Sequence, residues 1–191
     1  MRLDLSWRFD RWIRRLPSSP QDEGRVEGLV IRPDGSEAGA RAQVERVAVF
    51  PERGVAGDRW AESPYATPGN EVSIINVHFL REIAGGDPER MASSGDNLHV
   101  DLDLSQENLP TGTRLIVGSA VLEVSEVEHR PCRQFVERFG QTATKRVARA
   151  NRLGLRGRGV LCHVREGGEI AAGDTITVER PSDLRSSLSE E

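Results

Sequence analysis

Short apolar runs separated by glycine-containing turns constrain the fold of this chain more than any other feature of its sequence. The runs recur between Gly24 and Arg180, and several alternate apolar with polar residues, as half-buried strands do. They are Val26 to Val30, Val44 to Val49, Glu71 to Ile75, Asn97 to Leu102, Arg114 to Val117, Val121 to Val127, Gly159 to Val164 and Thr175 to Glu179. Gly118 and Ser119 separate two runs by the spacing of a tight hairpin. The pattern predicts a mainly β protein with flanking helices (α+β), built on a β-barrel or a strongly curved mixed sheet.

Helical periodicity interrupts the strand pattern in two places. Apolar residues recur at helical spacing from Val77 to Ile83 and from Arg133 to about Arg152. Asn76 directly precedes the first segment, and an asparagine side chain can cap a helix by accepting backbone N–H groups. We expect His78, in the first turn of that helix, to be structural.

The two ends of the chain differ from its middle. Residues 1–20 predict an amphipathic basic helix that ends near Pro17, with an apolar face and interspersed arginines. The apolar face consists of Leu5, Phe9, Trp12, Ile13 and Leu16. We expect this face to dock on the domain; membrane contact through residues 1–16, or binding to a partner, is the alternative. The domain itself is expected over residues 24–180, and residues 181–191 form a polar tail that we expect to be disordered.

Composition excludes several classes of protein. A net charge of −4 argues against a nucleic-acid binder. Two cysteines cannot build a disulfide framework, and no apolar run is long enough for a membrane span, so we expect a cytoplasmic protein. Of the 26 basic residues only Lys145 is a lysine. Because Lys145 lies in a polar helical run without a phosphate-binding loop, a pyridoxal phosphate enzyme is not expected.

Cys132 is the leading candidate for chemistry. It lies between Arg130 and Arg133, after a strand-like run and directly before the second helical segment. Positive charge and a helix N-terminus both favour the thiolate, which is the nucleophilic and metal-binding form of cysteine. The alternative is a small buried apolar residue, as most free cysteines are.

Three other places carry candidate binding residues. Asp58 and Arg59 follow Gly57 in a turn, where they could orient a ligand or only stabilise the turn. Asn97 could bond a ligand or satisfy the backbone at the start of a strand. The segment Gly154 to Gly159 contains Arg156 and Arg158, and such a loop can bind a phosphate or simply be a solvated turn.

A zinc site is an alternative hypothesis, since the sequence contains four possible ligands: His129, Cys132, Cys162 and His163. Adjacent residues of a strand point to opposite faces of the sheet, so Cys162 and His163 are not expected to reach one ion. Cys162, in an apolar run, is expected in the core.

The order of several short motifs resembles the MOSC domain, which is found at the C-terminus of molybdenum cofactor sulfurases. The resemblance spans residues 24–180. The motifs are Gly57-Asp58-Arg59, Val72 to Ile75, Gly95-Asp96-Asn97-Leu98, Leu109 to Thr113, Val117 to Val124, Pro131-Cys132, Gly157 to Val160, Glu166 to Ile170 and Gly173-Asp174. The resemblance implies a β-barrel core with flanking helices, similar to the β-barrel domain of pyruvate kinase.

The resemblance also implies a function for Cys132, which falls on the family's cysteine. In members that reduce N-hydroxylated compounds, including the mitochondrial amidoxime-reducing component and small bacterial hydroxylaminopurine reductases, that cysteine ligates the molybdenum of a molybdenum cofactor (molybdopterin). In the sulfurases the same position is proposed to carry sulfur. The resemblance therefore implies a molybdenum-dependent oxidoreductase, with a sulfur carrier or a non-catalytic cofactor-binding or scaffold domain as alternatives.

Six residues are expected to bind the cofactor on this basis: Asp58, Arg59, Asn97, Arg130, Arg156 and Arg158. The mitochondrial enzymes have an arginine two residues before the asparagine, where this chain has Gly95, so that one phosphate or pterin contact of the mitochondrial type is not assured here. The expected partners are a small-molecule substrate and a separate electron-donor protein, because the chain has no dinucleotide fingerprint and too few cysteines for an iron–sulfur cluster.

Overall fold

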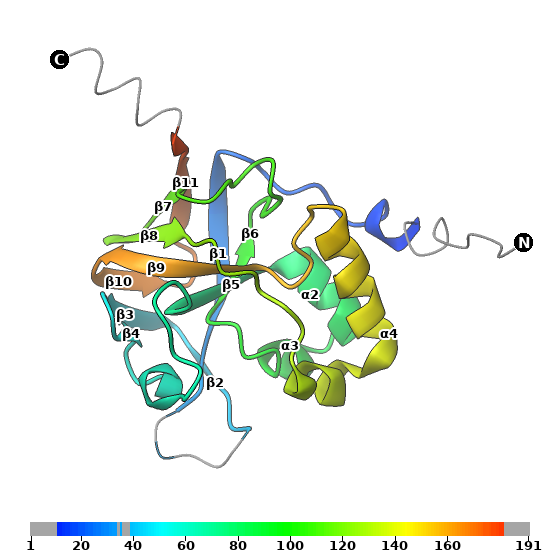
Figure 1. The fold of residues 1–191 in the computed structure, drawn as a ribbon, viewed down its shortest axis with the longest axis horizontal. Helices are drawn as coiled ribbons and strands as arrows, with labels where there is room; N and C mark the ends of the chain where they lie inside the picture. The colour runs from blue at the N-terminus through cyan, green and yellow to red at the C-terminus, as the bar shows by residue number, and fades with distance from the viewer. Residues whose placement is uncertain (1–10, 34, 36–38, 182–191) are drawn as a thin grey trace, which may run out of the picture.

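Seven strands close into a mixed β-barrel in the computed structural model, which describes residues 11–33, 35 and 39–181 (Figure 1). Around the barrel the order is β11 (Thr175–Glu179), β7 (Arg114–Val117), β8 (Ala120–Val124), β9 (Val160–Glu166), β5 (Val72–Asn76), β6 (Leu98–Asp101) and β1 (Glu23–Ile31). Antiparallel pairing of β1 with β11 closes the barrel, and β5 and β6 pair in parallel. The predicted barrel with flanking helices is confirmed.

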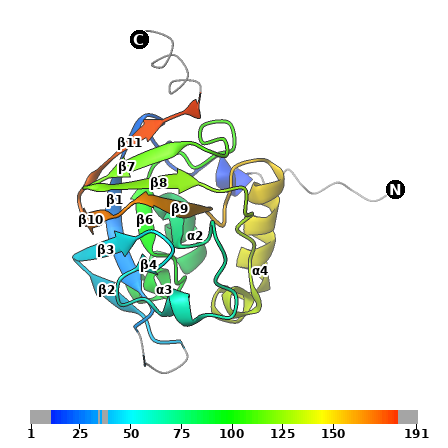
Figure 2. The same cartoon turned by 60° about the vertical axis from the view of Figure 1, so that its left-hand side comes forward.

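Shorter strands extend this framework on one side. Strand β2 (Ala42–Val44) pairs with the end of β1, and a separate small sheet joins β10 (Gly168–Ala171), β3 (Arg46–Phe50) and β4 (Gly54–Val55). Figure 2 shows this small sheet beside the barrel, below β9. Only Gly167 separates β9 from β10, which begins at Gly168.

The barrel encloses the main hydrophobic core. Alternate residues of each strand point inward, as in β8, where Ala120, Leu122 and Val124 are buried and the residues between them are partly exposed. The hairpin predicted at Gly118-Ser119 is present, with Val117 opposite Ala120. Gly118 adopts a positive φ of 57°, which a tight hairpin turn requires.

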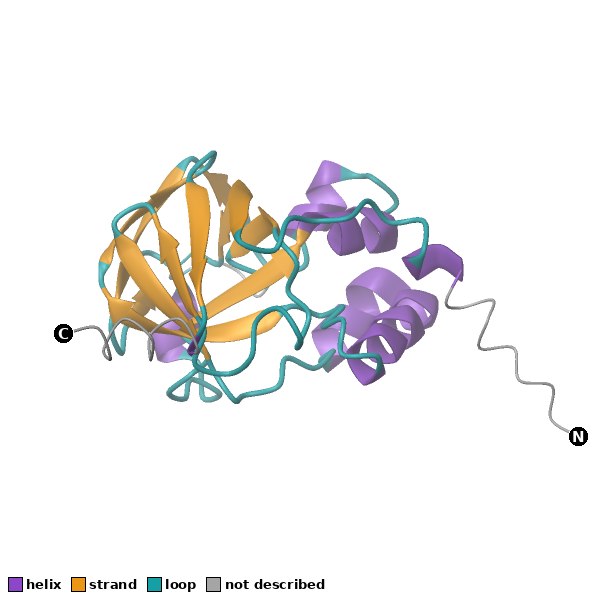
Figure 3. Cartoon of the chain, turned by 90° about the horizontal axis from the view of Figure 1, so that it is seen from above, coloured by secondary structure: helices purple, strands orange, loops and turns teal. Residues whose placement is uncertain are grey.

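Helices lie to one side of the barrel (Figure 3). Among them, α2 (Val77–Ala84) and α4 (Arg133–Arg152) pack against the outer side of β5, and α3 (Pro88–Ala92) follows α2 in the chain. Ile74 of β5 belongs to the barrel core, whereas Ile75 packs in a second cluster with Leu80 of α2 and Phe135 of α4. All five β5 residues are buried for this reason. The second cluster fixes the start of α4 against the barrel.

The helix boundaries agree with the sequence prediction, with one correction. Asn76 caps α2 by accepting hydrogen bonds from the backbone N–H groups of His78 and Phe79 at 2.9 and 3.1 Å. The predicted continuous helix from Arg133 to Arg152 is interrupted at Gly140, whose φ of 78° and ψ of 171° are not helical. Glycine adopts this conformation without a steric penalty, and the two halves of α4 therefore meet at a kink.

Two short helices were not predicted. Helix α3 is a single turn capped by Asp87, and η1 (Arg59–Glu62) is a 3₁₀ turn capped by Asp58. Both are too short to show periodicity in the sequence.

The N-terminal segment packs on the domain as far as it is described. Residues 11–13 are helical, and the Trp12 ring packs edge-on against Phe79 of α2, with 5.5 Å between centroids. The Arg146 guanidinium lies 5.5 Å from the Trp12 ring centroid. The remaining predicted helix over residues 1–10, and residues 182–191 of the tail, lie outside the described residues. Over the described ranges, no helix has the length and apolar character needed to cross a bilayer.

Candidate functional site

Cys132 occupies the N-cap position of α4, with an extended backbone conformation (φ −92°, ψ 173°). Its side chain makes no capping hydrogen bond and is exposed. The segment between the end of β8 at Val124 and Cys132 is held by a hydrogen bond. The Asn151 side-chain amide donates to the carbonyl oxygen of His129 at 3.1 Å. The fold therefore presents a free thiol at the positive end of a helix dipole.

Arg138 lies in the second turn of α4, on the same helix as Cys132. Burial lowers the pKa of Arg138, and the nearby Cys132 acts in the opposite sense. One guanidinium nitrogen donates to the carbonyl oxygen of Ser93 at 2.9 Å. Arg138 thus bridges α4 and the loop after α3.

Arg138 lies near three further arginines, and we call Arg32, Arg41, Arg59 and Arg138 the arginine cluster. Burial, and then the positive charges of Arg138, Arg32 and Arg59, lower the pKa of Arg41 to about 10. Asp58, which binds Arg32 at 2.7 Å, acts in the opposite sense. Four positive charges and the one negative charge of Asp58 give these five residues a net charge of +3.

This excess of positive charge is held in a partly buried setting. The Nε atom of Arg41 is buried without a hydrogen-bond partner, and its Nη1 donates to the carbonyl oxygen of Ala40 at 2.6 Å. Like charges at low dielectric repel each other, so the arrangement is favourable chiefly when an anion balances it. The arginine cluster is therefore a candidate anion site beside a thiol.

Asp58 and Asn97 hold Arg32 of the arginine cluster in place through hydrogen bonds. Both Asp58 carboxylate oxygens accept hydrogen bonds from Arg32, and one also accepts the backbone N–H of Trp60, at 2.9 Å. The Asn97 amide donates to Asp58 and to the carbonyl oxygen of Val30, and its oxygen accepts two hydrogen bonds from Ser73. Because these contacts use all the donors and acceptors of the Asn97 amide, its part in the site is to position Asp58 and thereby Arg32.

A second buried network supports the start of α4. Arg158 binds both carboxylate oxygens of Asp96 at 2.6 Å, and Asp96 lies 3.8 Å from Nδ1 of His129. Burial raises the pKa of Asp96, but Arg158 and then His129 outweigh it, so the pKa lies below its usual range. Burial, followed by the charge of Arg158, lowers the pKa of His129 to about 3. His129 is therefore neutral near pH 7.

The structure separates Arg130 and Arg156 from these networks. Arg130 is exposed and forms an ion pair with Glu128, at 2.6 Å. Arg156 donates to the carbonyl oxygen of Leu109 at 2.6 Å and lines a cavity of about 130 Å³ together with His129 and Asn151. In the same loop Gly159 is required by packing, because a Cβ there would lie 1.9 Å from the carbonyl oxygen of Ile74.

The four zinc candidates do not form a cluster. Cys162 is fully buried in the barrel core, and burial raises the pKa of its thiol. His163 lies 3.7 Å from Glu71, while His129 lies near Asp96. Within the described part of the chain, no group of three or more histidine, cysteine or acidic side chains is placed to hold a metal ion.

Comparison with known families decides the class of this chain. The sequence model of the MOSC domain matches residues 66–177, which is more than half of the chain. This chain belongs to the MOSC domain family. The resemblance inferred from its motifs is thereby confirmed.

Several solved structures share the fold of this MOSC protein. The YuaD protein from Bacillus subtilis is 25% identical with a TM-score of 0.59, covering 82% of this chain and 95% of that one. YiiM from Escherichia coli is 20% identical with a TM-score of 0.52, covering 80% and 69%. YiiM from Geobacillus stearothermophilus is 15% identical with a TM-score of 0.55, covering 82% and 75%, and like the previous match shows a shared fold. No curated protein matches the sequence significantly.

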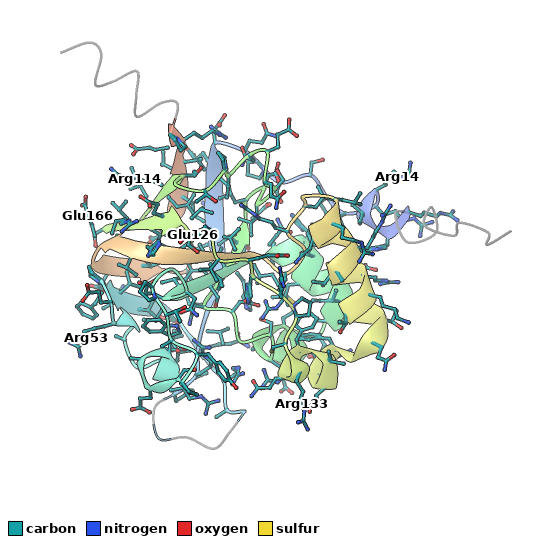
Figure 4. All side chains as sticks on the ribbon, viewed as in Figure 1. Arg14, Arg53, Arg114, Glu126, Arg133 and Glu166 are labelled. Atoms are coloured by element: carbon teal, nitrogen blue, oxygen red, sulfur yellow. The ribbon has the colours of Figure 1, made fainter. Side chains whose placement is uncertain are left out.

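Three residues of this MOSC protein's candidate site were not predicted from the sequence: Arg32, Arg41 and Arg138. Arginines occur throughout the chain, and these three come from the end of β1, the segment before β2 and the middle of α4. These three arginines come together only because α4 packs beside the barrel. No local sequence pattern predicts that packing. Arg133, by contrast, adjoins Cys132 in sequence and extends outward from the start of α4 (Figure 4).

Proposed function

We propose that this MOSC domain protein binds a molybdenum cofactor, with Cys132 as the protein ligand of the metal, and reduces N-hydroxylated compounds. The observation that carries the proposal is the exposed, uncapped thiol of Cys132 at the N-terminus of α4, the helix that also carries Arg138 of the arginine cluster. The cofactor requires both a thiolate for a soft metal and cations for its phosphate.

The residues present fit such a group. A thiol without a capping hydrogen bond is free to bind a metal, and the buried Nε of Arg41 has no hydrogen-bond partner among the described residues. When bound, the cofactor supplies a redox-active metal centre suited to oxygen-atom transfer. The protein supplies the ligand, the orientation and the charge balance.

Each part of the site has a proposed task. Cys132 holds the metal at the N-terminus of α4, where the helix dipole favours the thiolate. Arg41, Arg59 and Arg138 hold the anionic end of the cofactor. Asp58 and Asn97 keep Arg32 and η1 in place, and Arg158 supports the first turn of α4 through Asp96 and Phe135. The earlier candidates Arg130 and Arg156 are proposed as peripheral, since their guanidinium groups bind Glu128 and main-chain carbonyls.

The proposed reaction is a two-electron reduction. The N–O bond of the hydroxylated substrate breaks, and two electrons and two protons are taken up. One proton goes to the nitrogen and the other to the hydroxyl oxygen, which leaves as water. A separate donor protein must supply the electrons, because this chain carries no flavin or nicotinamide fingerprint. We place the protein in the cytoplasm, where a reducing environment keeps the Cys132 thiol available.

The activity is tested with full-length protein made in a host that synthesises the cofactor. Dithionite-reduced methyl viologen replaces the unknown donor, and an amidoxime or an N-hydroxylated purine is the substrate. We expect substrate-dependent oxidation of the dye, its loss in Cys132→Ser, and its retention in Arg133→Ala, since Arg133 points into solvent and pairs with Glu137. Equal activity of Cys132→Ser and the unaltered protein would refute the role of the thiol.

A second candidate function follows from the same exposure of Cys132. A sulfur carrier also needs an accessible thiolate, which would hold a persulfide for a partner. Cold cyanolysis of the purified protein separates the two functions. A thiocyanate yield that depends on Cys132, in protein without molybdenum, supports the carrier. Molybdenum without cyanolysable sulfur supports the reductase.

A further inference from the structure

Gly95 makes room for the guanidinium group of Arg41. A Cβ atom added at Gly95 would lie 2.9 Å from Nε, 3.0 Å from Nη2 and 3.3 Å from Cζ of Arg41. Carbon atoms do not approach nitrogen this closely, so any larger residue at position 95 would have to displace the guanidinium group. The loop before β6 therefore seats an arginine that comes from the segment before β2.

The seated Arg41 side chain is only partly satisfied by the protein. Its Nη1 donates to Ala40, its Nε is buried against the Gly95 loop without a partner, and its Nη2 has no hydrogen bond to the described residues. The positive charges of Arg32, Arg59 and Arg138 surround it. An arginine that is short of hydrogen-bond acceptors and lies near other cations is suited to bind an anion by its planar fork.

We propose that Arg41, positioned by Gly95, is a determinant of anion binding at this site, and that its ligand is a phosphomonoester or another tetrahedral oxyanion. The inference rests on the proposed function for the identity of that phosphate as the cofactor's own. Gly95 acts as a positioning residue through its lack of a side chain, because a Cβ there would push the Arg41 guanidinium out of its seat.

The substitutions at Gly95 can be matched closely. Gly95 has a φ of 77°, so Gly95→Ala combines backbone strain with displacement of Arg41. Gly86 has a φ of 78°, and nothing lies within 4 Å of a Cβ built there. Gly86→Ala therefore reproduces the backbone strain alone. Arg133→Ala removes an arginine next to Cys132 that is exposed in solvent and serves as the charge control.

The experiment titrates inorganic phosphate into full-length protein made without the cofactor and follows arginine side-chain N–H signals by NMR. We expect saturable shifts in the unaltered protein, including the Arg41 Nε–H signal. Arg41→Ala and Gly95→Ala should each weaken phosphate binding about tenfold or more, the effect expected on losing a charge-assisted hydrogen bond. Gly86→Ala and Arg133→Ala should change it less than about twofold.

A double variant tests whether Gly95 acts through Arg41. If it does, Arg41→Ala combined with Gly95→Ala should bind phosphate no more weakly than Arg41→Ala alone. Arg41→Gln, which keeps the three side-chain carbons and a polar end without the charge, serves if the alanine variant does not fold. Phosphate affinity that is unchanged in the Arg41 variants, or an unaltered protein that binds no phosphate, overturns the inference.

The phosphate titration does not require molybdenum, so failure of this inference can be distinguished from failure of the proposed function. Phosphate binding that depends on Arg41 in a protein that never retains molybdenum would leave this inference standing and refute the proposed function. Conversely, a protein that retains molybdenum but binds phosphate equally well in the Arg41 variants would refute this inference and leave the proposed function standing.

Discussion

The guanidinium group of Arg158 lies over the ring of Phe135, 4.9 Å from its centroid. Phe135 is in the first turn of α4, three residues after Cys132, and Arg158 precedes β9 of the barrel. The same guanidinium group binds Asp96 in the loop before β6. One buried arginine thus ties the helix that presents the thiol to two strands of the barrel.

Removing this arginine should destabilise the whole domain. Arg158→Ala leaves the Asp96 carboxylate buried without its partner, and breaking a buried ion pair in this way costs about 3–5 kcal/mol. Urea unfolding followed by circular dichroism measures the loss. Arg165→Ala is the control, because its pair with Glu123 at 2.7 Å is at the surface and should contribute less than about 1 kcal/mol. A loss of similar size in both variants would contradict the structural role of Arg158.

Stability should fall as the pH is lowered below about 6.5, the ordinary pKa of histidine. Burial lowers the pKa of His129 to about 3 and lowers the pKa of His99 as well, so both are neutral in the folded protein and take up protons on unfolding. Their contribution is complete above the ordinary pKa and is lost as the pH falls towards about 3. Arg158, Asp96 and Arg32 are the charged groups that act on His129, and Asp96 and Arg158 also act on His99.

The measurement is the free energy of unfolding in urea between pH 7.5 and pH 4.5. His129→Asn should reduce the slope by up to about 1.4 kcal/mol per pH unit, the value for one proton. An identical slope in His129→Asn would show that His129 is not held neutral by the fold.

The two cysteines should differ sharply in reactivity. Cys132 is exposed and Cys162 is buried in the barrel core, so iodoacetamide should modify only Cys132 until the protein is unfolded. Mass spectrometry of timed samples, taken with and without urea, gives the rate at each cysteine. Modification of Cys162 in the folded protein, or no modification of Cys132, would contradict the exposure that the structure gives to the two thiols.

Trp12 should contribute to the stability of the domain. Its side chain is 7% exposed and packs against Phe79 and Arg146. Replacing a buried tryptophan by alanine costs about 3–5 kcal/mol, and the value here should lie at or below the lower end because the segment is short. Thermal unfolding of Trp12→Ala compared with Arg14→Ala, an exposed neighbour, measures it. No difference between the two variants would mean that the segment does not dock in solution.

The barrel could be predicted because its strands carry their own signals. Alternating burial in β8, β9 and β11 follows directly from the alternating residues, and Gly118 marks its hairpin. Strand β5 shows the limit of this reasoning. Its residues are apolar on both faces, and only the fold reveals that Ile74 faces the barrel and Ile75 the helices.

Part of the candidate site could also be predicted. Cys132 was found from its position before a helix, and the structure leaves it exposed. Arg156 was chosen because glycines surround it, yet its guanidinium group binds main-chain carbonyls and Gly159 serves packing. No local pattern in the sequence indicates a role for Arg41, although Gly95 stands where the mitochondrial enzymes have an arginine. The structure seats the Arg41 guanidinium on Gly95 from another segment, a relation that depends on tertiary contact alone.

The most direct test of the central claim is the molybdenum content of the protein. Full-length protein and Cys132→Ser, both made in a host able to synthesise the cofactor, are purified in parallel and measured by inductively coupled plasma mass spectrometry. The account predicts molybdenum in a nearly stoichiometric amount in the unaltered protein and its loss in Cys132→Ser, with the fold of the variant intact by circular dichroism. An unaltered protein without molybdenum, or a Cys132→Ser variant that retains it fully, would contradict the account.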